Sequence, residues 1–169
     1  MNNLSLKDLL IKEFAREMAT TRNILERVPF DRSTWIPHEK SMPLGRLAIH
    51  IASIAGMGSD ILEKDSLSFN GPRPQSEIND TASLLELFVG NTAKTETALR
   101  ETTDERLAEP WSLSFGDRTV FSGSRAEALR TLMMNHLIHH RAQLGVYLRI
   151  NGVPIPGSYG PSADEPISS

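Results

Sequence analysis

Apolar residues recur at helical spacing in four stretches of the chain, and segments rich in polar residues or proline separate these stretches. The first stretch carries Leu10 and Phe14 on one stripe and predicts a helix from about Leu6 to Val28. Ser5 stands directly before it and can cap its first turn, with Asp8 completing a weak capping box.

The second and third stretches predict two further helices. The second should run from about Pro43 to Glu63, with His50 within its broad apolar face, and its alanines and glycines make it slim enough for a neighbour to approach closely. The third should run from about Thr81 to Glu101, capped by Asp80. The polar segment from Asp65 to Asn79 between them is predicted to be a loop.

The fourth helix has the clearest boundaries. Ser124 and Glu127 form an S-x-x-E capping box, and Asn151-Gly152 is a stop signal after about Ile150. The preceding segment, Pro110 to Gly123, alternates apolar and polar residues around a Gly-Asp turn, which is compatible with a hairpin or an extended loop. We favour the loop slightly.

Four long amphipathic helices predict an all-α protein, a four-helix bundle. A chain of 169 residues suits one domain with one core, so we expect a single domain over residues 1–169. Residues 152–169 are rich in Pro, Gly and Ser and should form an irregular tail.

Composition narrows the possible functions. A net charge of -3 and the lack of a basic stripe argue against a nucleic-acid partner, and no apolar run reaches the length that crosses a membrane. The N-terminus carries charges within its apolar pattern, so we do not expect a signal peptide. The chain has no cysteine, which excludes disulfides, thiolate ligands and a cysteine nucleophile. A cytoplasmic location is the expectation.

Three histidines are candidates for metal ligands. His136 and His140 lie one helical turn apart, about 40° around the axis, so both can reach one ion. His50, on the inner face of the second helix, can supply a third nitrogen, because facing helices meet in the core of a bundle. Three neutral protein ligands would leave coordination positions open for water or substrate.

Other interpretations of these and neighbouring residues remain open. His139 competes with His140 as a partner of His136, although the apolar stripe continues through His140 and leaves His139 at its edge. The three histidines could instead be core or interface residues, each satisfied by a hydrogen-bond partner. His38 could line the mouth of a pocket. For Arg141, an outward salt bridge is favoured over a grip on an acidic group near the site.

Four segments carry a resemblance to a known family. They are Trp35–Met42, Leu47–Ala52, Asn135–Leu144 and Val153–Glu165, in that order along the chain. With these segments, the chain resembles the DinB/YfiT-like superfamily of bacterial four-helix metalloproteins over most of its length. The last segment is similar to the tail of one branch whose reaction has no assignment.

The resemblance implies several properties that the spacing does not show. Members have an up-down-down-up helix arrangement with a long crossover and commonly form homodimers. They typically bind a divalent metal, often zinc or nickel, on three histidines, which correspond here to His50, His136 and His140. Characterised relatives include thiol-dependent transferases and isomerases that use mycothiol or bacillithiol.

Together these observations lead to one main hypothesis and two rivals. The main hypothesis is a metal-dependent enzyme that acts on a small molecule, with thiol S-transfer as the specific reaction. No catalytic base is identified; His38, Arg141 and Tyr159 are candidates only for lining the pocket. The rivals are a non-catalytic metal-binding or stress-response protein, and a dimeric helical protein without metal.

Overall fold

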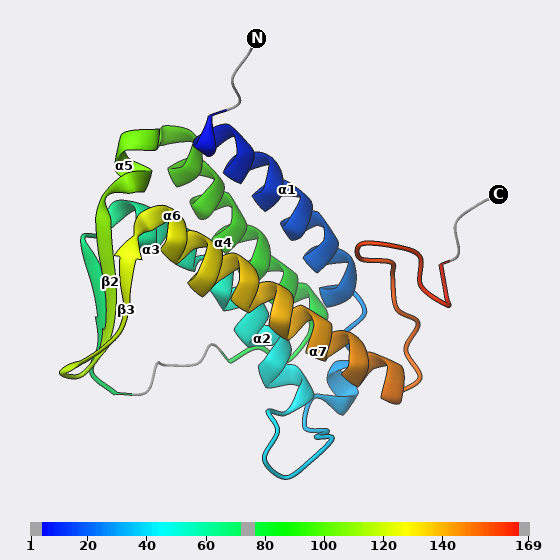
Figure 1. Ribbon diagram of the computed structural model, residues 1–169. Helices are drawn as coiled ribbons and strands as arrows, with labels where there is room; N and C mark the ends of the chain where they lie inside the picture. The colour runs from blue at the N-terminus through cyan, green and yellow to red at the C-terminus, as the bar shows by residue number, and fades with distance from the viewer. Residues whose placement is uncertain (1–4, 72–76, 166–169) are drawn as a thin grey trace.

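The computed structural model describes residues 5–71 and 77–165, which are mostly helical. Figure 1 shows that one long helix and the last helical segment run in one direction, whereas the two segments between them run in the other. The segments are α1 (Leu6–Leu25), α2 (Leu44–Ile54) continued by α3 (Met57–Glu63), α4 (Thr81–Glu101), and α6 (Arg125–Ala128) continued by η2 (Leu129–Asn135) and α7 (His136–Ile150).

Packing between these segments places α2 and α7 side by side. Helix α1 packs against α4 and α7, and α2 packs against the same two helices. Buried Leu, Ile, Ala and Met side chains from all of them form the core, among them Leu47, Ile51, Leu84 and Leu137. The histidines predicted on the second and fourth helices are therefore on neighbouring elements.

A small sheet at one end of the helices corrects the all-α prediction. Its strands are β1 (Ser66–Phe69), β2 (Pro110–Phe115) and β3 (Arg118–Ser124), in the order β1-β2-β3. β2 and β3 are antiparallel and joined at Gly116, which has φ +54°. The hairpin interpretation is thus confirmed and the preferred loop is wrong, because alternation buries Trp111 and Leu113 beneath the hairpin.

Strand β1 lies in the segment that was predicted to be a loop. It pairs in parallel with β2, with Ser66 opposite Ser112 and Phe69 opposite Phe115. The strand alternates between exposed and half-buried residues, but four residues are too few for the alternation to be recognised, and its partner strand is far along the chain. Two short helical turns, η1 (Phe30–Arg32) and α5 (Asp104–Ala108), complete the described elements. Residues 72–76 of the predicted loop and 166–169 of the predicted tail lie outside the described residues.

The predicted second helix is divided at Ala55 and Gly56 rather than continuous. Side chains of α4 satisfy the carbonyls left free there: Thr95 Oγ1 donates to the Ala55 oxygen at 2.7 Å, and Asn91 Nδ2 donates to the Ala52 oxygen at 3.0 Å. A Cβ at Gly56 would lie 2.9 Å from the Asn91 side chain, so glycine permits this close approach. The break depends on contacts with another helix.

The helix caps are at the predicted residues, but the interior of the last predicted helix is not a continuous α-helix. Ser5, Asp80 and Ser124 each accept a backbone N–H of the first turn, and Ser124 with Glu127 forms the full capping box. The residues that follow form the π-helical segment η2, which ends immediately before His136. Wider turns of this kind are uncommon and often adjoin functional sites.

No helix within the described residues combines the length and the apolar character needed to cross a membrane.

Candidate metal centre

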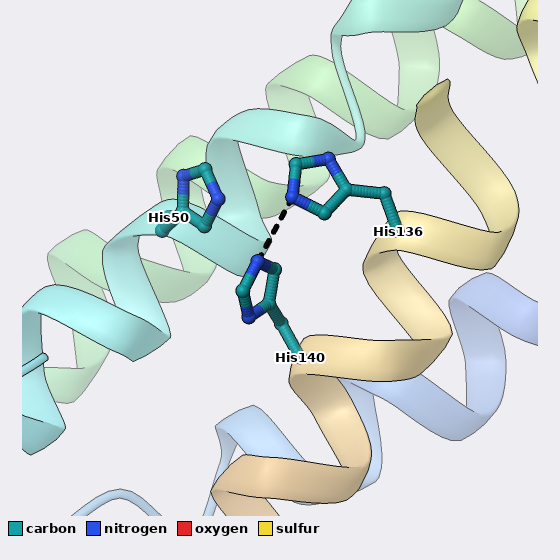
Figure 2. Close-up of side chains that lie close together, drawn as sticks. All are labelled: His50, His136 and His140. Atoms are coloured by element: carbon teal, nitrogen blue, oxygen red, sulfur yellow. Dashed lines mark hydrogen bonds between the residues drawn. The ribbon is translucent and has the colours of Figure 1, made fainter. Parts of the chain in front are cut away.

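His50, His136 and His140 meet between α2 and α7 (Figure 2). One nitrogen from each ring lies within 4.8 Å of the others. His136 and His140 share a face because they are one helical turn apart, and α2 presents His50 to the same space. The inner-face stripe predicts that these side chains are enclosed in the core, but in the structure all three are half-buried.

Hydrogen bonds on the far side of two rings determine which nitrogens face inward. The Nδ1 atom of His136 lies 3.3 Å from the Leu132 carbonyl oxygen, and the Nδ1 atom of His140 lies 2.7 Å from Gln143 Oε1. Carbonyl and amide oxygens only accept, so both Nδ1 atoms carry a proton and donate it. In the neutral rings, both Nε2 atoms then present a lone pair, which is the form that binds metal.

The separation of those two Nε2 atoms fits a shared cation. They lie 2.9 Å apart, at the contact that Figure 2 marks with a dashed line. Two such lone pairs repel each other, whereas nitrogens that each bind one ion at about 2.0–2.1 Å are separated by roughly 3 Å. The donor set and its spacing therefore suit a divalent metal held by imidazoles.

Electrostatics favour the neutral form of one ligand. Burial lowers the pKa of His136, and the neighbouring His140 lowers it further, while the hydrogen bond to the Leu132 carbonyl raises it. His136 is therefore neutral at pH 7 and needs to lose no proton before it can bind a metal.

This pKa shift predicts how the metal-free protein responds to acid. A proton binds the His136 imidazole more readily in the unfolded chain, whose ordinary pKa is about 6.5, than in the folded chain. The contribution of His136 to the free energy of unfolding should be present above pH 6.5 and lost as the pH falls through the lowered folded value. Urea titrations between about pH 5 and 8, with a chelator present, should show His136→Gln losing part of this slope. The exposed His139, changed to Gln, should leave the slope unaltered, and an equal slope in all three proteins would contradict the prediction.

The prediction of an outward salt bridge for Arg141 is wrong, because its side chain points inward rather than to solvent. Its side chain is only 2% exposed and pairs with Glu17 of α1, with 2.8 Å between Nη1 and Oε2. Nη1 also donates to Thr21 Oγ1 at 3.1 Å. Tyr159 of the tail donates to Glu17 Oε2 and accepts from Arg141 Nη2, each at 2.8 Å. This network joins α1, α7 and the tail around the buried Arg141–Glu17 pair.

Tyr159 takes part in this network in its protonated form. Burial raises the pKa of its hydroxyl, and the hydrogen bond to Glu17 raises it further, against the opposing effect of Arg141. The hydroxyl therefore remains a donor to the carboxylate at neutral pH. Tyr159 lines a groove beside Arg141, so the prediction that it lines a pocket holds for that groove and not for the histidine cluster.

The other residues considered from the sequence lie outside the cluster. His139 is exposed, with its ring centroid 5.0 Å from that of His140, and it is not one of the three grouped histidines. His38 is exposed in a loop, where its Nδ1 accepts the Lys40 N–H at 3.1 Å. Sequence reasoning missed Gln143, although its position three residues after His140 on a helix could have indicated the contact.

Comparison with known proteins agrees with the arrangement of helices. The family model described as the DinB family matches residues 1–167. The chain belongs to the DinB family. Two relatives from Bacillus subtilis (strain 168) are the uncharacterized protein YrdA, 24% identical over 94% of this chain and 90% of its own length, and the uncharacterized protein YjoA, 27% identical over 85% and 89%.

Solved structures of DinB-like proteins have the same fold. The B. subtilis protein YjoA has a TM-score of 0.66 at 22% identity, covering 87% of this chain and 96% of that one. A DinB-like protein from Bacillus cereus ATCC 10987 has a TM-score of 0.70 at 21% identity, covering 92% and 99%. At these identities the likeness establishes the DinB-like fold.

Proposed function

We propose that this DinB-family protein binds a divalent metal, zinc or nickel, through His50, His136 and His140, and acts as a metal-dependent enzyme on a small molecule. The specific reaction proposed is transfer of a low-molecular-weight thiol, of the bacillithiol or mycothiol kind, to an electrophilic substrate. The observation that carries the proposal is the convergence of three imidazole nitrogens within 4.8 Å.

The chain's own groups support a site that is open to substrate. The Leu132 carbonyl and Gln143 hold two of the rings by their Nδ1 atoms, so the orientation of the Nε2 atoms is determined before any ion binds. Three protein ligands rather than four are typical of catalytic sites, in which one position is kept for water or substrate. When bound, a divalent ion supplies Lewis acidity that lowers the pKa of a coordinated thiol or water.

The chain has no cysteine, so in the proposed reaction the thiol belongs to the substrate. In the proposed reaction, the thiol loses its proton to solvent, and its sulfur forms a bond to an electrophilic carbon. The bond from that carbon to the leaving group breaks, and the leaving group departs with the electron pair. The half-buried histidine cluster would hold the sulfur away from bulk water without enclosing it.

A thiol-conjugation assay tests the proposed reaction. Metal-free protein and protein loaded with zinc or nickel would be mixed with bacillithiol, mycothiol or glutathione and monochlorobimane, whose chloride is displaced by sulfur. We expect a fluorescent adduct to form faster than without protein, only with metal and with at least one of the thiols.

Two variants make the assay specific for the site. His140→Ala should return the rate to that of the uncatalysed reaction, whereas the matched change His139→Ala, at the next position on the same helix, should retain activity. Stoichiometric metal binding without turnover of any thiol would contradict thiol transfer and favour the non-catalytic metal-binding alternative.

A further inference from the structure

The histidine cluster has two ends, and the antiparallel course of α2 and α7 determines which residues border each of them (Figure 1). Trp35 establishes the register at one end. Its carbonyl oxygen accepts the N–H of Leu44, the first residue of α2, at 2.9 Å, and its ring lies edge-on to Tyr147 of α7 with the centroids 5.4 Å apart. Residues that precede His50 on α2 therefore lie level with residues that follow His140 on α7.

Arg46 and Gln143 border this end of the cluster, which we call the Arg46 end. Arg46 precedes His50 by four residues, so the two side chains leave α2 within about 40° of each other. The side chains of Arg46 and Gln143 are both exposed. Gln143 Oε1 accepts the proton of His140 Nδ1 at 2.7 Å, and the NH₂ group of the same amide can donate to a ligand. This end therefore presents a guanidinium and an amide donor beside the imidazoles.

The opposite end of the cluster is apolar. Leu132, one turn before His136, and Met57, the first residue of α3, are half-buried and pack against the core. Ser53, on the next turn of α2, donates its hydroxyl to the Ile49 carbonyl oxygen at 2.8 Å. A charged group on a ligand is therefore better accommodated at the Arg46 end than at this one.

The charges at the cluster favour an anionic ligand. The three proposed metal ligands are imidazoles, which bind in their neutral form, so none of them offsets the charge of a divalent ion. The Arg46 guanidinium is always protonated and adds a positive charge one helical turn away. A molecule that carries a thiolate and a carboxylate would compensate both charges. With five N–H donors, Arg46 can bind a carboxylate in addition to contacts within the chain.

We propose that Arg46 selects the substrate of this site by binding a carboxylate of the thiol, with the Gln143 amide as a second donor. This inference rests on the proposed function and narrows it to thiols that carry a carboxylate. The sulfur lies at the imidazole nitrogens, and a spacer of about two or three carbons connects it to the carboxylate, because side chains one turn apart start about 5–6 Å from each other. The electrophile then reaches the sulfur from the apolar end, past Leu132 and Met57.

Binding of small thiols to the cobalt-loaded full chain tests this assignment without any turnover. Cobalt(II) accepts the same imidazole ligands as zinc and nickel, and a bound thiolate adds a sulfur-to-cobalt absorption that reports binding. β-Mercaptopropionate, its uncharged amide and the cation cysteamine have spacers of the same length and differ in charge. The wild type should bind the acid about tenfold more tightly than the amide, and cysteamine most weakly.

Variants at Arg46 make the test specific for this side chain. Arg46→Gln should remove the preference for the acid over the amide, and Arg46→Glu should reverse the order, so that cysteamine binds more tightly than the acid. Cobalt content should stay at the wild-type level in both, because Arg46 is exposed and is not a proposed ligand. The control is Arg16→Glu, which makes the same charge change at an exposed arginine of α1 and should keep the wild-type order.

The outcomes separate this assignment from the proposed function. With cobalt bound, equal affinity of the wild type for the acid and the amide would overturn the role of Arg46 alone. An equal loss of preference in Arg16→Glu and Arg46→Glu would do the same, because it would indicate an effect of net charge. A protein that takes up no cobalt, or that takes it up and binds none of the three thiols, would contradict the proposed function and this inference with it.

Discussion

Protein carrying His140→Ala is expected to lose the divalent metal proposed for the site, falling from near one ion per chain to background in elemental analysis. Removing His140 leaves His136 without the partner whose Nε2 lies 2.9 Å away, so the two-ligand face of α7 is lost. His50→Ala removes the only ligand from α2 and should weaken binding comparably, by at least about 100-fold. Thermal unfolding gives a second readout, because a ligand at about 1,000 times its dissociation constant stabilises the folded state by about 4 kcal/mol. Added metal should therefore raise the unfolding temperature of the wild type and not that of either variant.

The control for this experiment is His139→Ala. This exposed histidine adjoins His140 in the chain and lies outside the cluster, so its loss should leave metal content near the wild-type level. All measurements require protein without a histidine tag. Equal, near-zero metal in the wild type and the His50 and His140 variants would remove the central proposal, and equal, stoichiometric metal would place the site elsewhere.

Arg141→Ala should produce the largest loss of stability among the substitutions considered. It leaves the Glu17 carboxylate, whose side chain is 6% exposed, without the cation that compensates its burial. Breaking one side of a buried pair typically costs about 3–5 kcal/mol. For a chain of this size, that corresponds to a fall in unfolding temperature on the order of 10 °C. Chemical denaturation and calorimetry would both measure the loss.

A matched substitution distinguishes burial from charge. Arg22 and Glu26 form an ion pair of the same length, 2.8 Å, on the same helix as Glu17, but their side chains are 51% and 43% exposed. Arg22→Ala should therefore cost less than about 1 kcal/mol. The double change Arg141→Met with Glu17→Leu should recover much of the loss, because neither charge is then left buried alone. A cost below 1 kcal/mol for Arg141→Ala would show that the buried network is not a major source of stability.

The helices could be predicted because their signals are local. Ser5, Asp80 and Ser124 each cap a helix by accepting a hydrogen bond from the backbone N–H three residues later in the chain. The π-helical turns of η2 are a different case. Nothing in the residue types from Leu129 to Asn135 distinguishes them from an α-helix, although they directly precede His136.

In the candidate site, too, local patterns predict some residue positions, and contacts between distant segments determine others. Helical periodicity placed His136 and His140 on one face, and the apolar stripe excluded His139. The same reasoning placed Arg141 toward solvent, since a charged residue beside an apolar stripe is usually exposed. Its partner Glu17 lies on α1, far earlier in the chain, and no local pattern indicates that pairing.

Local patterns in the chain therefore predict the long helices, their caps, and the three candidate histidine ligands. The three-stranded sheet, the break at Gly56, the burial of Arg141 with Glu17, and the 2.9 Å approach of the two Nε2 atoms arise only in the folded protein. Helix and cap signals arise from hydrogen bonds and side-chain spacing within a few residues. The other features depend on groups that meet only after the chain has folded. They are strand pairing, the helix break whose free carbonyls bond to another helix, and buried ion pairs.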